Sequence, residues 1–145
     1  MSVEVKVVRE ATDEVVEAVT RLLPQLSRTA AVPDRESVDR MLRSDANTLL
    51  LAQTADRVVG MLTLIMYPLP SGLRSRIEDV VVDDAARGQG VGAALTNEAL
   101  RLAEEAGART VDLTSRPSRQ AANRLYERLG FQGRDSQVYR FVVQP

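Results

Sequence analysis

Apolar residues recur along the chain with two periods, one of two residues and one of three to four. Period-two alternation, or a short apolar run between turn residues, indicates a β-strand, whereas a period near 3.6 indicates an amphipathic helix. Strands are predicted at 3–8, 48–54, 58–67, 74–82 and 110–114, with a closing pair around Phe131 and at 138–143. Helices are predicted at 13–23, 34–42, 91–106 and 118–129. This order predicts an α/β (α+β) chain with a mixed sheet.

Capping residues indicate where the helices begin and end. Thr12 is a preferred N-cap, and the two carboxylates after it suit the positive end of a helix dipole. Pro24 is expected to disturb this first helix, because proline removes a backbone donor. Gly107 and Gly130 follow the third and fourth helices, where glycine adopts the left-handed conformation that ends a helix.

The predicted strands are joined in different ways. Residues 48–67 are expected to form a hairpin around the turn 55–57. Residues 68–73 contain two prolines and a glycine and are expected to form a loop. The valines at 80–82 form a continuous apolar run, which predicts a strand buried on both faces in the middle of the sheet.

Length and apolar content suit one domain. The chain has 145 residues, of which 44% are hydrophobic, and no linker interrupts residues 1–145. No apolar run approaches the roughly 18 residues that a spanning helix needs. The first residues alternate like a strand and lack the apolar block of a signal peptide. We therefore expect a cytoplasmic protein without a membrane partner.

Charge and missing residue types narrow the chemistry. The 19 basic and 20 acidic residues are interleaved and give a net charge of −1, which argues against a nucleic-acid partner. The basic residues are almost all arginine, as expected of a GC-rich bacterial genome. The chain has no cysteine and no histidine, so it lacks a thiolate nucleophile, the commonest general base and the commonest metal ligands. We expect no metal site, and catalysis would use carboxylates, tyrosine, water and backbone groups.

The most distinctive segment is Arg-Gly-Gln-Gly-Val-Gly-Ala at 87–93, between a β-branched run and a helical pattern. Its three glycines let the backbone turn tightly and present several N–H groups to one anion. The helix that starts at about Gly90 adds unpaired N–H groups and the positive end of its dipole. A diphosphate suits this loop, whose spacing matches neither the NTPase loop nor the dinucleotide fingerprint. The alternative is a turn that binds nothing.

Two motifs resemble those of the GNAT superfamily of acyl-CoA-dependent N-acyltransferases. The first, Arg-Gly-Gln-Gly-Val-Gly at 87–92, follows Val82-Asp83 and is similar to the family pattern Arg/Gln-x-x-Gly-x-Gly/Ala. The second is Asn-Arg-Leu-Tyr-Glu-Arg-Leu-Gly-Phe at 123–131, and together they cover about residues 74–133. The resemblance implies a GNAT-like mixed central β-sheet of about six to seven strands flanked by about four helices in a single domain, in agreement with the predicted elements.

The resemblance also implies how acetyl-CoA would bind. Backbone N–H groups of the glycine-rich segment would hold the pyrophosphate, with the charge of its arginine nearby. The end of the preceding strand would pair its backbone with the pantetheine arm. The residues implied in binding are Val80, Val81, Val82, Arg87, Gly88, Gln89, Gly90, Val91, Gly92, Ala93, Asn123 and Tyr126. The valines also suit a core strand, and the two roles are compatible.

Tyr126 is the candidate general acid. In the family, the tyrosine of the second motif points its hydroxyl at the thioester sulfur. A phenol with a pKa of about 10 can protonate a thiolate with a pKa of about 8.5 when the site stabilises the exchange. The alternative is an amphipathic tyrosine that closes the core. Asn123 lies one turn earlier on the same helix face, where it is either a ligand of the pantetheine chain or an exposed amide.

Glu78 is the preferred candidate for the general base, with Asp79 as the alternative. Adjacent strand residues point to opposite faces, so one of the two must face the acceptor side. A carboxylate near the apolar centre of a sheet is expected to have a raised pKa, which suits proton removal directly or through a water. The competing interpretation is a solvated carboxylate or an ion pair with Arg74 or Arg76.

These inferences predict an enzyme, an N-acetyltransferase that moves an acetyl group from acetyl-CoA to a primary amine of a small molecule or a protein. The absence of cysteine favours direct attack in a ternary complex. The alternatives are a catalytically weak CoA-binding or regulatory module with a GNAT fold, and a phosphate-binding domain unrelated to CoA. Acceptor specificity is expected to depend on residues 24–47 and 68–73. The acidic and basic residues there are interleaved, so their charges cancel and do not indicate the acceptor. Open sheet edges permit a homodimer.

Overall fold

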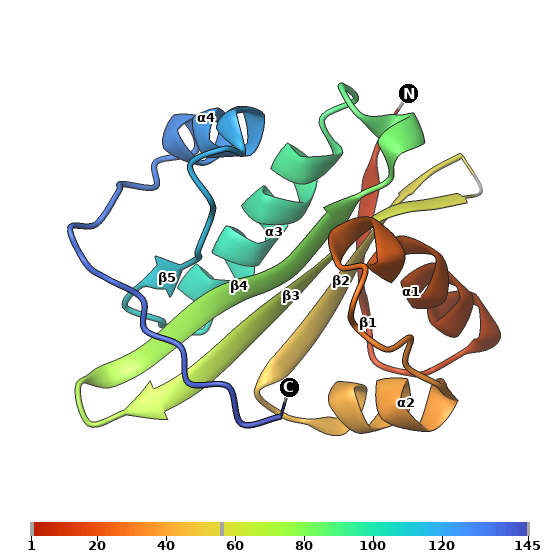
Figure 1. The fold of residues 1–145 in the computed structure, drawn as a ribbon, viewed down its shortest axis with the longest axis horizontal. Helices are drawn as coiled ribbons and strands as arrows, with labels where there is room; N and C mark the ends of the chain where they lie inside the picture. The colour runs from red at the N-terminus through yellow and green to blue at the C-terminus, as the bar shows by residue number, and fades with distance from the viewer. Residues whose placement is uncertain (1, 56, 145) are drawn as a thin grey trace. The chain divides into compact units, whose positions relative to one another are not determined.

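The computed structural model describes residues 2–55 and 57–144. The chain divides into two compact units, Met1–Thr114 and Ser115–Pro145, and each is described by itself. In chain order the elements of the first unit are β1 (Glu4–Val8), α1 (Asp13–Leu26), α2 (Arg35–Arg43), β2 (Asn47–Thr54), β3 (Arg57–Leu69), β4 (Gly72–Val82), the 3-10 turn η1 (Asp84–Ala86), α3 (Val91–Glu105) and β5 (Val111–Asp112) (Figure 1). The second unit holds α4 (Gln120–Arg128). The expectation of one domain over 1–145 stays a prediction.

The strands form one five-stranded sheet in the order β1-β2-β3-β4-β5. Neighbours from β1 to β4 are antiparallel, and β5 is parallel to β4. The predicted mixed sheet with four helices is therefore confirmed, with fewer strands than expected. None of the helices in the described part of the chain has the length and apolar character required to span a bilayer.

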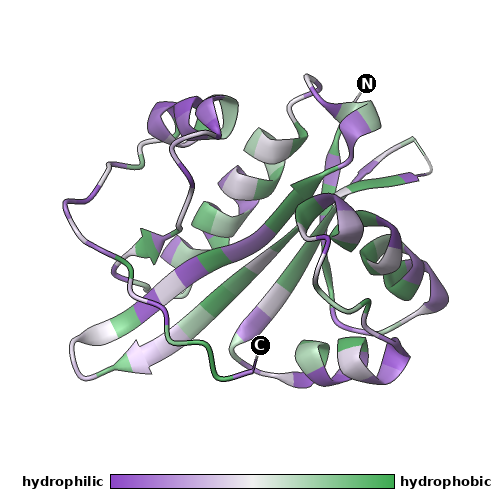
Figure 2. Ribbon diagram, in the orientation of Figure 1, coloured by the Kyte–Doolittle hydropathy of each residue, from purple (hydrophilic) through white to green (hydrophobic). Residues whose placement is uncertain are grey.

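The strands that are missing are those predicted around Phe131 and at 138–143. Neither segment pairs with a strand among the described residues. Large apolar side chains of the second segment are solvent-exposed, namely Val138, Tyr139, Phe141, Val142 and Val143. Figure 2 shows hydrophobic colouring on the chain just before the C-terminus. Their composition favours a strand, but a strand also needs a neighbour for its N–H and C=O groups. The prediction was wrong because composition does not supply that neighbour.

The first helix is not disturbed by its proline. α1 runs through Pro24 and ends at Leu26. Proline removes one intrahelical donor and crowds the preceding turn, a cost that falls when the helix ends shortly afterwards. The predicted disturbance was therefore wrong.

The predicted loop at 68–73 is a tight hairpin turn between β3 and β4. Pro68 lies opposite Leu73 and Leu69 opposite Gly72, so the two strands stay paired up to the turn. Met66 donates its N–H to Ala46 at 2.8 Å, on the side of β2. Two residues later β3 has extended past β2, so the missing N–H of Pro68 leaves no sheet bond unmade.

The predicted caps are confirmed. The hydroxyl of Thr12 accepts a hydrogen bond from the N–H of Val15 at 3.3 Å. Gly107 and Gly130 have φ of 83° and 103°, in the left-handed region that follows a helix. The β2–β3 hairpin predicted at 48–67 also forms.

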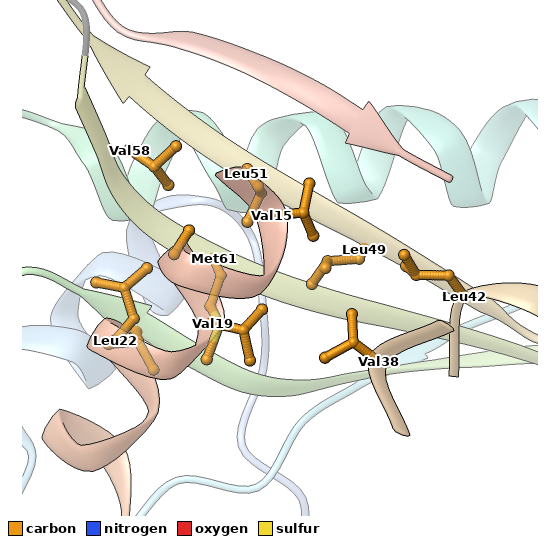
Figure 3. Close-up of a cluster of buried hydrophobic side chains, with 11 residues drawn as sticks. Val15, Val19, Leu22, Val38, Leu42, Leu49, Leu51, Val58 and Met61 are labelled. Carbon is orange, nitrogen blue, oxygen red and sulfur yellow. The ribbon is translucent and has the colours of Figure 1, made fainter. Parts of the chain in front are cut away.

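Different helices cover the two faces of the sheet (Figure 1). On one face, α1 and α2 pack on β2, β3 and β4 in a core cluster of Val15, Ala18, Val19, Leu22, Val38, Leu42, Leu49, Leu51, Val58, Met61 and Val81 (Figure 3). On the other face lies α3, which approaches the sheet at Gly60. A Cβ atom there would lie 2.8 Å from Val91 Cγ1 and 3.1 Å from Leu95 Cδ1. Glycine at this position therefore sets how closely α3 packs.

Candidate functional site

The glycine loop, residues 87–93, leads from η1 into α3. Gly88 and Gly90 have φ of 82° and 78°, a conformation that L side chains rarely adopt. Open space surrounds the Cβ position of both residues. The backbone conformation, and not packing, therefore requires glycine here. Gly92 lies inside α3 and is not among the glycines with positive φ.

The glycine loop presents a row of free backbone donors. Among the described residues, no hydrogen bond uses the N–H groups of 88–93. The first bond of the helix runs from Ala94 N–H to Gly90 C=O at 3.0 Å. Residues 87–90 are exposed, and the positive end of the α3 dipole lies at the same place. This arrangement can bind an anion such as a phosphate group.

Buried residues hold the chain just before the glycine loop and in its second half. Ala86, just before it, is 3% exposed, and Val91, within it, is 1% exposed. Arg87 pairs with Asp84 at 2.9 Å, and both side chains are largely in solvent. Exposed pairs of this kind contribute less than about 1 kcal/mol, so Arg87 remains free to turn toward an anion.

The valine run at 80–82 lies on a half-open edge of the sheet. Only Val81 is buried, while Val80 and Val82 are partly exposed. β5 pairs with β4 at Ser75 and Arg76 alone, so the next residues have no strand partner on that side in the described part of the chain. The prediction of burial on both faces was therefore wrong. The free backbone groups on this edge are the kind that an extended ligand can pair with.

A β-bulge interrupts β4 next to this edge. Glu78 lies opposite Thr63 and Val81 lies opposite Met61, so two residues of β4 face the single residue Leu62. Asp79, in the bulge, has φ of 52°. The expectation that Glu78 and Asp79 alternate as in a regular strand was wrong for this reason.

The two candidate bases differ in their surroundings. Glu78 is exposed and accepts a hydrogen bond from Arg76 Nε at 3.1 Å. Arg76 also donates to the Thr114 hydroxyl at 3.0 Å. The alternative of an ion pair is thus observed for Glu78. The pKa of Asp79 is raised, first by desolvation of its carboxyl and then by the negative charge of Glu78, although the residue as a whole is exposed.

Tyr126 lies on α4 in the second unit and is 8% exposed. Its ring packs edge to face against Phe131, with centroids 5.7 Å apart. Burial raises the pKa of the Tyr126 phenol, and the charge of Arg119 partly opposes this. No hydrogen bond among the described residues uses its hydroxyl. The group is therefore protonated at neutral pH and has no competing protein partner there.

Asn123 has local partners for its amide. Its side-chain oxygen accepts a hydrogen bond from the Ser115 hydroxyl, and its nitrogen donates to Arg116 C=O at 3.0 Å. These contacts hold the segment that leads into α4. A role in holding pantetheine stays a prediction.

Glu78, the open edge at 80–82 and the glycine loop thus follow one another along the chain in the first unit. Tyr126 and Asn123 belong to the second unit. No three of the His, Cys, Asp and Glu side chains in 2–55 and 57–144 gather as metal ligands. Sequence reasoning missed the role of Asp83, which is 5% exposed and pairs with Arg21 and Arg57. Since these arginines are 62 and 26 residues away, no local pattern could reveal the pairs.

Comparison with known proteins identifies relatives of this chain. The sequence profile of the Acetyltransferase (GNAT) family matches residues 13–131. An uncharacterised N-acetyltransferase of Methanocaldococcus jannaschii is 36% identical over 61 residues, which are 42% of this chain and only 27% of that relative. A solved transcriptional regulator from Bacillus halodurans C-125 has a TM-score of 0.80 at 28% identity, over 97% of this chain and 100% of the other. An acetyltransferase from Trypanosoma brucei has a TM-score of 0.79 at 26% identity, with the same coverage.

The family match spans most of the chain and includes both motifs, the glycine loop and the α4 segment. The solved neighbours share the fold over almost the whole length. The chain therefore belongs to the GNAT family of acetyltransferases.

Proposed function

We propose that this protein transfers an acetyl group from acetyl-CoA to a primary amine, in a small molecule or a protein, by direct attack in a ternary complex. The observation that carries the proposal is the row of free N–H groups at 88–93, at the positive end of α3. A pyrophosphate is an anion of suitable size and charge for this row. The half-open edge at 80–82 offers backbone groups to the amide-rich pantetheine arm.

In the chemical step, a carboxylate of β4 takes the proton of the attacking amine. Glu78 is the preferred base, directly or through a water, because its carboxylate is exposed on β4, and its ion pair with Arg76 competes with this role. Asp79 is the alternative, and its raised pKa suits proton removal. The amine nitrogen attacks the thioester carbon, a C–N bond forms, and the C–S bond breaks as the tetrahedral intermediate collapses. Backbone N–H groups near the bulge are candidates to stabilise the oxyanion.

Tyr126 is proposed to donate its proton to the departing CoA thiolate. Its pKa is raised, so the phenol carries its proton at neutral pH. The proposal requires that the Tyr126 hydroxyl reach the sulfur of CoA bound at the glycine loop. The absence of cysteine from the chain favours this direct route over an acyl-enzyme.

Titration calorimetry with acetyl-CoA, CoA and ATP tests the binding step. We expect micromolar binding of acetyl-CoA and CoA and no binding of ATP. Gly90→Ala should weaken acetyl-CoA binding about tenfold or more, because alanine disfavours the left-handed conformation that aims the donors. Gly107→Ala is a matched control, since that residue has a similar φ at the opposite end of α3. Absence of acetyl-CoA binding to the unaltered protein would refute the proposed function.

Release of CoA thiol with a panel of amines tests the chemistry, without background from a cysteine-free chain. Tyr126→Phe should lower kcat about 100-fold with little change in KM for acetyl-CoA. Tyr139→Phe is the control, because that tyrosine is 87% exposed. An unchanged kcat in the Tyr126 variant would remove it from the mechanism.

A regulatory CoA-binding module is the second candidate. It is favoured by the likeness to a transcriptional regulator at 28% identity, the highest identity among the structural comparisons given above. Such a module would bind acetyl-CoA in calorimetry but release no thiol with any amine. Release of CoA thiol with any one amine would show that the protein is an enzyme and not only a binding module.

A further inference from the structure

The entry to the glycine loop is held by a buried carboxylate. Asp83 follows β4 directly and is 5% exposed. One oxygen, Oδ2, accepts hydrogen bonds from Arg21 Nη1 and Arg57 Nη2, each at 3.2 Å. The other, Oδ1, accepts from the N–H of Ala85 at 3.0 Å and so caps η1. A carboxylate this buried is stable only when its oxygens are paired in this way.

The two arginines connect this carboxylate to separate elements. Arg21 lies on α1, and its Nη2 also donates to Val58 C=O on β3 at 3.0 Å. On the side away from Asp83, the same guanidinium pairs with Glu17 at 2.8 Å. Arg57 is the first residue of β3. Asp83 thus joins α1 and β3 to the turn that precedes the glycine loop.

The backbone around Asp83 strengthens this attachment. Its N–H donates to Val59 C=O at 2.8 Å, and its C=O accepts from Ala86 N–H at 2.8 Å. The N–H of Asp84 donates to the side chain of Gln25 on α1 at 3.0 Å. Residues 88–90, by contrast, have no hydrogen-bond partner for their N–H groups among the described residues. The direction of those donors therefore depends on how the two ends of the loop are held.

We propose that Asp83 is a positioning residue for acyl-CoA binding, acting through Arg21 and Arg57. It does not touch the ligand; it sets the start of the glycine loop so that the N–H groups of 88–93 converge on one phosphate-sized point. This inference rests on the proposed function, in which that loop holds the pyrophosphate. Preorganised donors lose less entropy on binding, so loosening the entry weakens ligand binding without changing the reacting groups.

Three single variants test the inference. Asp83→Asn removes the charge but keeps an oxygen that can cap η1, and Arg57→Gln removes one partner of Asp83 at an exposed side chain. Glu17→Gln is the matched control, because it also removes a charged partner of Arg21 but leaves Asp83 and the loop untouched. The measurements are the Kd for acetyl-CoA by calorimetry, kcat and KM with a reactive amine, and amide hydrogen exchange at 87–93. Circular dichroism confirms that each variant is folded.

We expect Asp83→Asn and Arg57→Gln to raise Kd and KM about tenfold, with kcat within about twofold of the unaltered protein and faster exchange at 87–93. Glu17→Gln should change none of these. The double variant of Asp83 and Arg57 should bind no more weakly than Asp83→Asn alone, because both changes break one connection.

Other outcomes overturn the inference. If all three single variants bind acetyl-CoA with the same Kd as the unaltered protein, Asp83 does not position the loop. A loss of kcat in proportion to the folded fraction, at constant KM, would show a purely structural role. If the unaltered protein binds no acetyl-CoA, the proposed function fails instead. Hydrogen exchange at 87–93 then still shows whether Asp83 holds the loop, so the two failures are distinguishable.

Discussion

Glu78 lies within β4 and Asp83 directly follows it, but the surroundings of these two acidic residues are opposite. Asp83 is buried and paired with two arginines from distant parts of the chain. Glu78 is exposed and paired with one arginine two residues away on its own strand. The fold depends on the charge of Asp83, since a buried carboxylate without its pairs is costly. Glu78 is exposed, so its side chain is accessible to a ligand and contributes little to the packing of the fold.

The largest expected effect is on stability, where the two carboxylates should differ most. Asp83→Ala should lower the free energy of unfolding by about 2–4 kcal/mol, because it leaves two arginines without their buried partner. Glu78→Ala should lower it by less than about 1 kcal/mol, as for other exposed pairs. Urea denaturation followed by circular dichroism measures both. Similar losses for the two variants would show that burial does not separate the residues.

The next effect is on catalysis, where the change at Glu78 should have the larger effect and the change at Asp83 the smaller one. Glu78→Gln should lower kcat/KM about 100-fold, or about 2.7 kcal/mol in the barrier, if Glu78 takes the proton of the amine. Glu36→Gln is the control, because Glu36 is an exposed carboxylate paired with Arg40 on α2. A larger loss with Asp79→Asn than with Glu78→Gln would transfer the role of base to Asp79.

A smaller effect concerns the backbone of the bulge beside Glu78. Asp79 has φ of 52°, which aspartate tolerates and a β-branched residue does not. Asp79→Val should therefore lower the free energy of unfolding by about 1–2 kcal/mol, while Asp79→Gly should change it by less than about 0.5 kcal/mol. Thermal unfolding of both variants measures this difference. If valine is tolerated as well as glycine, the left-handed conformation at this position is not required.

The smallest effect is on the pH dependence of stability. The pKa of Asp79 is raised in the folded chain, so its ionisation opposes folding, and this destabilisation grows as pH rises from 3.8 through the folded pKa. Asp79→Asn should therefore be more stable than the unaltered protein at neutral pH, by less than about 0.5 kcal/mol for so exposed a residue. The advantage should vanish below the ordinary aspartate pKa of 3.8. Urea titrations at several pH values measure it, and a gain that grows toward low pH would contradict the assignment.

The features that were predictable from sequence are those set by near neighbours. The left-handed glycines, the cap at Thr12 and the strand-loop-helix order around 87–93 depend on residues within a few positions. The pairs of Asp83 depend on residues that are close only after folding. The strand prediction at 138–143 was wrong for a related reason. Its residues suit a strand, but no local signal says whether a neighbouring strand is present.

The bulge in β4 also changes the phase of the strand. Glu78 and Val81 are three positions apart, an odd number that would place them on opposite faces of a regular strand. Their partners Thr63 and Met61 are two positions apart and share a face, so Glu78 and Val81 share that face too. One extra residue thus lets a polar group and a core valine point the same way. Deleting this extra residue would move every later side chain of β4 to the opposite face of the sheet. Buried side chains would become exposed, and exposed ones buried, up to the glycine loop.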